Sequence, residues 1–194
     1  RGECWITNTQ VNFCARAYPT VPVGHPDAAA LTVLGTFLRN GFLHRAIREQ
    51  GGAYGGGASQ DSTVAAFRFF SYRDPRLAET LQDFDASVAW LLNEQHAADT
   101  VEEAILGVIS SLDKPASPAG EARQDFHNRR FGRDHAQRTT FRQRVLAVTL
   151  DDLRRVAQCY LTPENASTAV ITGAGQRDAS AALRQELGLE LREL

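Results

Sequence analysis

Methionine is absent from all 194 residues, and position 1 itself is an arginine. We therefore expect the chain to be processed or excised from a longer protein. Cysteine is scarce as well: Cys4, Cys14 and Cys159 are an odd number and show no C-x-x-C spacing, which indicates neither a disulfide framework nor a zinc ribbon. Reduced and mostly buried thiols in a cytosol-like compartment are the simplest interpretation.

The chain also lacks an excess of charge and a long apolar run. Its 21 Lys and Arg and 23 Asp and Glu give a net charge of −2, so no basic surface for nucleic acid is predicted. No apolar run is long enough to span a bilayer, and the N-terminus lacks the pattern of a signal peptide. With 43% hydrophobic and 23% charged residues, the composition is that of a folded domain. We expect a soluble protein with neither a nucleic-acid nor a membrane partner.

Strands are predicted from apolar spacing at 11–17, 64–72 and 167–172. In the first, the odd positions from Val11 to Ala17 are apolar, which predicts that they form the buried face. The second is rich in Phe and Val and is predicted to be covered on both faces. Six helical segments are predicted, at about 26–50, 74–91, 100–112, 120–146, 149–160 and 179–187. Gly51 is expected to end the first, Asp74 and Pro75 to cap the second, and Thr100 with Glu103 to form a capping box for the third. The fourth, at 120–146, is predicted to be a polar helical hairpin.

This order of elements predicts an α+β fold. Helices would pack on a mainly antiparallel sheet, with a helical segment at 99–161 between the strands. About three strands are visible in the sequence, fewer than a typical sheet carries. The length of the chain fits a single domain over 1–194.

The densest signal is the segment REQGGAYGGG at 48–57, where a helix ends in Arg48 and passes into five glycines accompanied by Tyr54. One interpretation is a flexible turn with a buried tyrosine. Another is a loop that another backbone can approach closely, because glycine has no side chain. A phosphate-binding loop is not indicated, because no Lys-Ser/Thr follows the glycines and they come after a helix instead of opening one.

Three collinear segments resemble one protein family. The segment LHRAIREQGGAYG at 43–55 is similar to the Arg/Tyr motif in the C-terminal half of the pitrilysin (insulinase-like) zinc peptidases, and specifically of their presequence-protease branch. SLDKPASP at 111–118 agrees with that branch, as does FGR at 131–133 leading through RVL at 144–146 to TLDDL at 149–153. Together the resemblance covers roughly 24–175.

The resemblance implies a clamshell of two homologous halves around an unfolded peptide, with this chain as the C-terminal domain of a zinc metalloendopeptidase of pitrilysin/mitochondrial-processing-peptidase-like fold. Zinc would be held by the N-terminal half of the same polypeptide, because this chain has no H-x-x-E-H motif and binds no metal in this interpretation. Arg48 would bind backbone carbonyls of the substrate, and Tyr54 would stabilise the oxyanion that develops at the scissile carbonyl. Gly51, Gly52, Ala53 and Gly55 would lie against the substrate, with Gly56 and Gly57 helping to keep the loop slim.

Other candidate residues have simpler explanations. No two of the five histidines are four residues apart, so all are interpreted as surface or cap residues; they are His25, His44, His96, His127 and His135. The basic stretch 123–144 is interpreted as a solvated helix pair rather than a polyanion site. Asp151 and Asp152 are interpreted as first-turn carboxylates that interact with a helix dipole.

Two alternative functions stay open. A non-catalytic, peptide-binding or structural member of the same family would lack the metal motif upstream. A glycine-loop module for a small molecule would be unrelated to proteolysis and would bind its ligand without any partner domain. The expected compartment is a bacterial cytoplasm or, second, an organellar matrix, and an isolated domain of this kind is expected to be prone to self-association.

Overall fold

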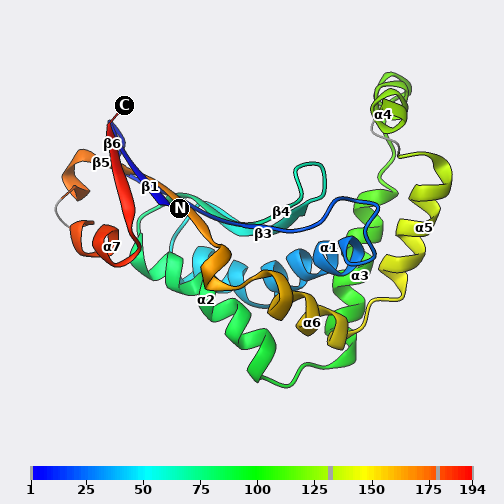
Figure 1. The fold of residues 1–194 in the computed structure, drawn as a ribbon, viewed down its shortest axis with the longest axis horizontal. Helices are drawn as coiled ribbons and strands as arrows, with labels where there is room; N and C mark the ends of the chain where they lie inside the picture. Colours follow the sequence, from blue (N-terminus) through cyan, green and yellow to red (C-terminus); the bar gives the residue numbers. More distant parts are fainter. Residues whose placement is uncertain (1, 131–132, 178–179, 194) are drawn as a thin grey trace.

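The computed structural model describes residues 2–130, 133–177 and 180–193, and one six-stranded sheet organises them (Figure 1). The strands are β1 (Gly2–Thr7), β2 (Asn12–Pro19), β3 (Gly55–Asp61), β4 (Ala66–Asp74), β5 (Ser167–Gly173) and β6 (Leu189–Glu193). Their spatial order is β3-β4-β2-β5-β1-β6, with β1 parallel to β5 and β6 and the other pairings antiparallel. The predicted α+β fold with a mainly antiparallel sheet is confirmed.

Helices cover one face of this sheet, while its opposite face carries no described helix over its centre (Figure 1). The α-helices are α1 (Ala28–Leu38), α2 (Ala78–Asn93), α3 (Ala98–Leu112), α4 (Pro118–Arg130), α5 (His135–Leu146), α6 (Leu150–Tyr160) and α7 (Ala181–Glu186). A π-helical segment, η1 (Arg39–Gln50), continues α1, and two short 3₁₀ turns follow later, η2 (Pro163–Asn165) and η3 (Ala174–Gln176). The two polar helices predicted at 120–146 are observed as α4 and α5, but they do not form a hairpin, since α4 lies beyond the end of α5 instead of packing along it (Figure 1). Phe131 and Gly132 of the family motif lie outside the described residues.

The prediction of which face of β2 is buried was wrong. Cys14, Arg16 and Tyr18 point into the helical layer and are at most 6% exposed, whereas Phe13, Ala15 and Ala17 lie on the open face and are half-buried. Successive side chains of a strand point to opposite faces, so the apolar odd positions meet no helix. Strand β4 behaves in the same way, with buried residues alternating, and was wrongly expected to be covered on both sides.

A buried arginine explains why the polar position of β2 can face the core. Arg16 is 6% exposed and donates hydrogen bonds to Asp85 on α2 and to the Thr168 hydroxyl on β5. A buried charge is tolerated when it is paired and hydrogen-bonded. The Arg16–Asp85 ion pair therefore ties the middle of the sheet to α2.

Several predicted element boundaries were also wrong. Strands β1, β3 and β6 were not recognised, because three of the seven residues of β3 are glycine and the other two strands have only six and five residues. Val64 lies in the β3–β4 turn instead of a strand, and the last helix, expected at 179–187, is observed at 181–186. The helix expected to be capped by Asp74 and Pro75 begins at Ala78; the Asp74 carboxylate instead accepts hydrogen bonds from the Arg76 N–H and the Thr80 hydroxyl.

Helix capping differs from the expectation at two further points. The box predicted at Thr100 and Glu103 is absent, since α3 begins at Ala98 and its N-cap, Ala97, has no side-chain bond. A capping box occurs instead at Thr149 and Asp152, at the start of α6. Asp152 therefore has the helix N-terminal position predicted for it, with a hydrogen-bonding role in addition.

The long first helix changes its winding midway. Leu31, Leu34 and Leu38 form the buried stripe of α1, and Leu43 and Ile47 continue it along η1. The interval of five residues between Leu38 and Leu43 fits the wider π-helical turn. This winding keeps an apolar face against the sheet as far as the end of η1.

Helix and edge strand approach each other closely where both carry glycine. A Cβ on Gly35 of α1 would lie 3.0 Å from Ser59 Cα of β3, and a Cβ on Gly56 would lie 2.9 Å from both Ile47 Cγ2 and the Phe70 carbonyl oxygen. The glycines thus remove the side chains that would separate the helix from β3. The glycines at 55–57, predicted to lie in a turn, instead begin strand β3, because their close packing against the helix fixes their backbone.

We predict that Gly56→Ala destabilises the chain by about 1–3 kcal/mol, because its methyl group overlaps a backbone carbonyl that cannot rotate away. Urea unfolding of the purified chain measures the loss. Gly175→Ala is the matched control, because a Cβ there meets no atom within 4 Å. Equal unfolding midpoints for the two variants would show that the close approach is not a constraint.

A polar network at the N-terminal end of α1 links this helix to α6. The Asp27 carboxylate accepts hydrogen bonds from Arg155 Nη2 at 2.7 Å and from the Tyr160 hydroxyl at 2.8 Å. The Arg155 guanidinium is the main cause that lowers the pKa of Asp27, and desolvation with the bond to Asp27 raises the pKa of Tyr160 to about 12. The ionised aspartate and the neutral phenol are therefore the forms that stabilise the fold.

We predict that Asp27→Asn removes an acid-sensitive part of the stability. Because the folded-state pKa of Asp27 lies below its unfolded value of about 3.9, its contribution is complete above the unfolded value and disappears as the pH falls through the folded value. The variant should lose about 1–2 kcal/mol at pH 7, and the difference from the unmodified chain should shrink towards pH 2.

Urea unfolding at pH 7, 5, 4 and 3 tests this dependence. Asp151→Asn serves as the control, since that carboxylate is 95% exposed and lies 3.9 Å from Arg154. A pH-independent difference for Asp27→Asn would contradict the role of the ionised carboxylate.

Candidate functional site

The candidate site is the turn that joins η1 to β3. Arg48 lies in the last turn of η1, which ends at Gln50 with Gly51 as its C-cap, and Tyr54 directly precedes β3. The Gly52 N–H donates to the Arg48 carbonyl and the Ala53 N–H to the Ile47 carbonyl, both at 3.1 Å. Gly52 has a φ of +79°, a conformation that suits glycine. The turn thus places Arg48 and Tyr54 at its two ends, one in the last turn of η1 and the other immediately before β3.

Both predicted catalytic side chains face solvent. Tyr54 is 65% exposed, so the alternative of a buried tyrosine in a flexible turn is wrong. Within the described part of the chain, no hydrogen bond or ion pair engages the Arg48 guanidinium or the Tyr54 hydroxyl. Neither group forms a polar interaction that stabilises the described fold, so both keep their N–H or O–H donors for a ligand.

Tyr54 is nevertheless held from one side by the end of β4. Its ring lies 5.6 Å from the ring of Tyr72, inclined by 55°, and the Arg73 guanidinium carbon lies 5.7 Å from its centroid. The Tyr54 N–H donates to the Arg73 carbonyl at 3.3 Å. Sequence reasoning missed Tyr72 and Arg73 as site residues, although the first ends the strand predicted at 64–72 and the second follows it directly.

The remaining site residues have structural reasons of their own. A Cβ on Gly51 would lie 2.0 Å from Arg76 Nη2, the atom that bonds the Ala46 carbonyl and Asp83. A Cβ on Gly55 would lie 2.5 Å from the Tyr72 hydroxyl oxygen. Ala53 is 4% exposed and anchors the turn in the core. Contact of these residues with a substrate, as predicted, stays a prediction.

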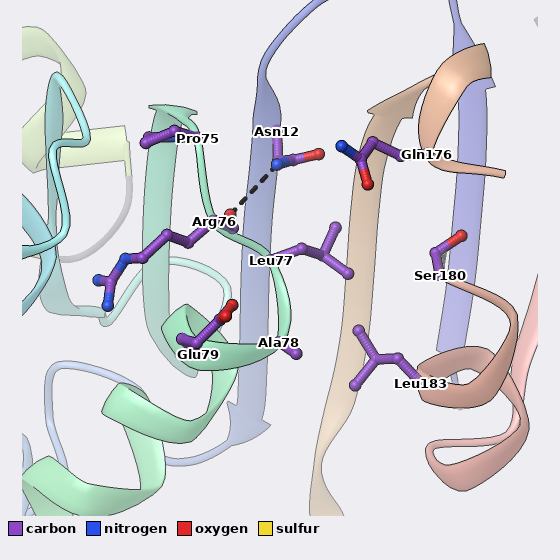
Figure 2. Close-up of a pocket in the computed structure, with 9 residues that line it drawn as sticks. All are labelled: Asn12, Pro75, Arg76, Leu77, Ala78, Glu79, Gln176, Ser180 and Leu183. Atoms are coloured by element: carbon purple, nitrogen blue, oxygen red, sulfur yellow. Dashed lines mark hydrogen bonds between the residues drawn. The ribbon is translucent and has the colours of Figure 1, made fainter. Parts of the chain in front are cut away.

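Neither of two cavities in the described structure is lined by a residue of the glycine segment 51–57. One, of about 300 Å³, opens between the start of α2 and the segment around α7, where Leu77 and Leu183 point towards each other (Figure 2). One of its buried polar residues, Asn12, already donates to the Arg76 carbonyl, drawn as a dashed line, and accepts from Thr172. A second cavity adjoins Asp27 and Arg155. Neither supports a glycine-loop site for a small molecule.

The described residues do not suit a metal ion. Across 2–130, 133–177 and 180–193, no three His, Cys, Asp or Glu side chains form a group that could hold one. His25 accepts from the Asp27 N–H, and His96 Nε2 lies 3.2 Å from the carbonyl oxygens of Trp90 and Leu91 at the end of α2. Cys4 and Cys14 are buried, with burial raising the pKa of Cys14 to about 12, while Cys159 is exposed.

Comparison with known proteins identifies the family. The family described as "PreP C-terminal domain" matches residues 2–173. This chain belongs to the presequence-protease C-terminal domain family. Curated relatives named "Presequence protease, mitochondrial" are 39% identical over 166 residues in Yarrowia lipolytica and 42% identical over 166 residues in Eremothecium gossypii, covering 86% and 84% of this chain.

The presequence-protease relatives are much longer than this chain. It spans 16% of the length of both curated relatives. The crystal structure of pitrilysin shares the fold, with a TM-score of 0.60 and 17% identity over 93% of this chain and 20% of that one. The predicted membership of the pitrilysin family, in its presequence-protease branch, is confirmed.

The described part of this presequence-protease domain contains no helix that is both long and apolar enough to cross a bilayer.

Proposed function

We propose that this domain supplies substrate-binding groups to a zinc metalloendopeptidase that degrades short unfolded peptides. The observation that carries the proposal is the pair Arg48 and Tyr54: both are exposed at the two ends of one turn, and among the described residues neither the guanidinium nor the hydroxyl has a hydrogen-bond or ion-pair partner. Buried polar groups are paired within the fold, whereas these two exposed donors keep their hydrogen-bonding capacity for water or a ligand. Donors held rigidly at the surface are instead suited to a ligand.

The chemistry of the two groups fits a peptide bond. A guanidinium donates two parallel hydrogen bonds and can grip backbone carbonyls without reading side chains. A phenol that donates to the scissile carbonyl oxygen stabilises the negative charge that develops there during attack by water. Zinc would activate that water, and in this proposal the N-terminal half of the longer polypeptide holds it, because the described residues offer no fitting group.

Partners and compartment follow from the same proposal. The N-terminal half would face this domain across the bound peptide, and the open sheet face keeps self-association of the isolated domain a prediction. The word "mitochondrial" in the relatives' names favours the organellar matrix over the bacterial cytoplasm. No nucleic acid or membrane takes part in the proposed activity.

We predict that Tyr54→Phe in the longer protein lowers kcat for cleavage of an unstructured peptide about a hundredfold, because one oxyanion donor is lost. A fluorescence-quenched peptide, assayed with and without a chelator, measures this. Tyr160→Phe is the matched control, since it removes a hydroxyl at the Asp27 network, outside the candidate site.

The two treatments separate the possible functions. Chelator-sensitive cleavage that falls only in Tyr54→Phe supports the proposal. No cleavage by the zinc-loaded protein identifies a non-catalytic family member. Full activity of Tyr54→Phe would leave a peptidase but refute the role of this hydroxyl.

We predict that Arg48→Lys raises KM about tenfold or more, because a lysine cannot reproduce the paired hydrogen bonds of a guanidinium while it keeps the charge. Arg45→Lys is the control: Arg45 is exposed on the same π-helix, one turn earlier. Steady-state kinetics on the same peptide distinguish the two. Equal changes in KM for both variants would indicate a general effect of replacing an exposed arginine on η1, and would contradict specific hydrogen bonds from Arg48 to the substrate.

A further inference from the structure

Arg73 occupies an irregular position at the end of β4, next to the candidate site. Between the pairs Asn12–Asp74 and Cys14–Ser71, β2 advances by two residues and β4 by three. Strand β4 therefore contains a bulge at Tyr72 and Arg73. Arg73 adopts a φ of +49°, one of two positive values among the described non-glycine residues, the other being Ala65 at +53°.

The conformation of Arg73 is unfavourable for any residue with a Cβ and suits glycine, which is common at such bulges. Strained residues of this kind are found at functional sites, where the surrounding structure fixes them. No ion pair of the described residues includes Arg73, so its charge does not stabilise the fold through a carboxylate. Its contacts run to Tyr54 instead.

Two groups of Arg73 act on the same residue. The carbonyl accepts the Tyr54 N–H, and the guanidinium lies over the Tyr54 ring. Tyr72 supports the ring from a second direction, in the space left by the missing side chain of Gly55. A cation near an aromatic face is attracted to the ring, so these contacts limit the orientations open to an otherwise exposed side chain.

We propose that Arg73 is a positioning residue that holds the Tyr54 phenol in its reactive orientation. This inference rests on the proposed function, in which the Tyr54 hydroxyl contacts the scissile carbonyl. The strained bulge places the guanidinium over the ring, and the bulge would form more easily with glycine. Arg73 thus contributes to activity at the expense of local stability.

The decisive variant is Arg73→Gly, which relieves the backbone strain and removes the guanidinium together. We expect its urea unfolding midpoint to equal or exceed that of the unmodified protein, while kcat for peptide cleavage falls about tenfold with little change in KM. Ala65→Gly is the matched control, because it relieves a positive φ in the β3–β4 turn without touching Tyr54. Its kcat should be unchanged.

A double variant tests whether Arg73 acts through Tyr54. In the Tyr54→Phe background, Arg73→Gly should lower kcat by less than twofold, since the hydroxyl it positions is already gone. A full tenfold loss in that background would overturn the proposal. If Tyr54→Phe lowers kcat but Arg73→Gly alone does not, the inference fails and the proposed function stands.

A spectroscopic readout is independent of catalysis. In this chain with ring-labelled tyrosine, the Tyr54 NMR signals, assigned by their loss in Tyr54→Phe, should move towards free-tyrosine values in Arg73→Gly and stay in place in Ala65→Gly. Partial return in Arg73→Lys, which restores a cation, would support the positioning role. Unchanged Tyr54 signals in Arg73→Gly would overturn it, even if the longer protein cleaves no peptide.

Discussion

The close approach of the first helix to the edge strand β3 is the constraint on which the candidate site depends. Gly35 on the helix side and Gly56 on the strand side leave no room for a Cβ between the two elements. Because interiors are packed to the density of organic crystals, this contact fixes where η1 ends relative to where β3 begins. The turn between them is then short and held by backbone hydrogen bonds, so the positions of Arg48 and Tyr54 follow from the packing of residues beneath them.

Because the helices cover only one side, the two faces of the sheet differ in their side chains. The helix-facing side of β2 includes a buried arginine, Arg16, paired with the exposed Asp85 of α2, whereas its open side carries Phe13 and Ala15. An apolar open face beside an exposed Tyr54 is unusual for a domain that stands alone. It fits the one-sixth of the relatives' length that this chain spans, since a domain of a longer protein can leave faces for its neighbours.

The helices were easier to predict from the sequence than the sheet. The stripes of α2 and α6 were correct because their apolar intervals follow the 3.6-residue period, while the roles of Arg48 and Tyr54, which the resemblance to the Arg/Tyr motif singled out, stay predictions. The face of β2 was wrong because a period of two says which residues share a face but not which face meets the helices. Strand β3 was missed because its three glycines have no strand propensity of their own and depend on helix packing. The interval from Leu38 to Leu43 was the one available signal for the π-helical segment.

Backbone strain could not be predicted from the sequence at all. Nothing distinguishes Arg73 from the other arginines in composition or spacing, because its positive φ arises from the register shift between β2 and β4. That shift also turns Tyr72 and Arg73 towards Tyr54, so a defect in strand pairing and the support of an exposed side chain share one cause. The irregularity is therefore better understood as part of the site than as a fault in the sheet.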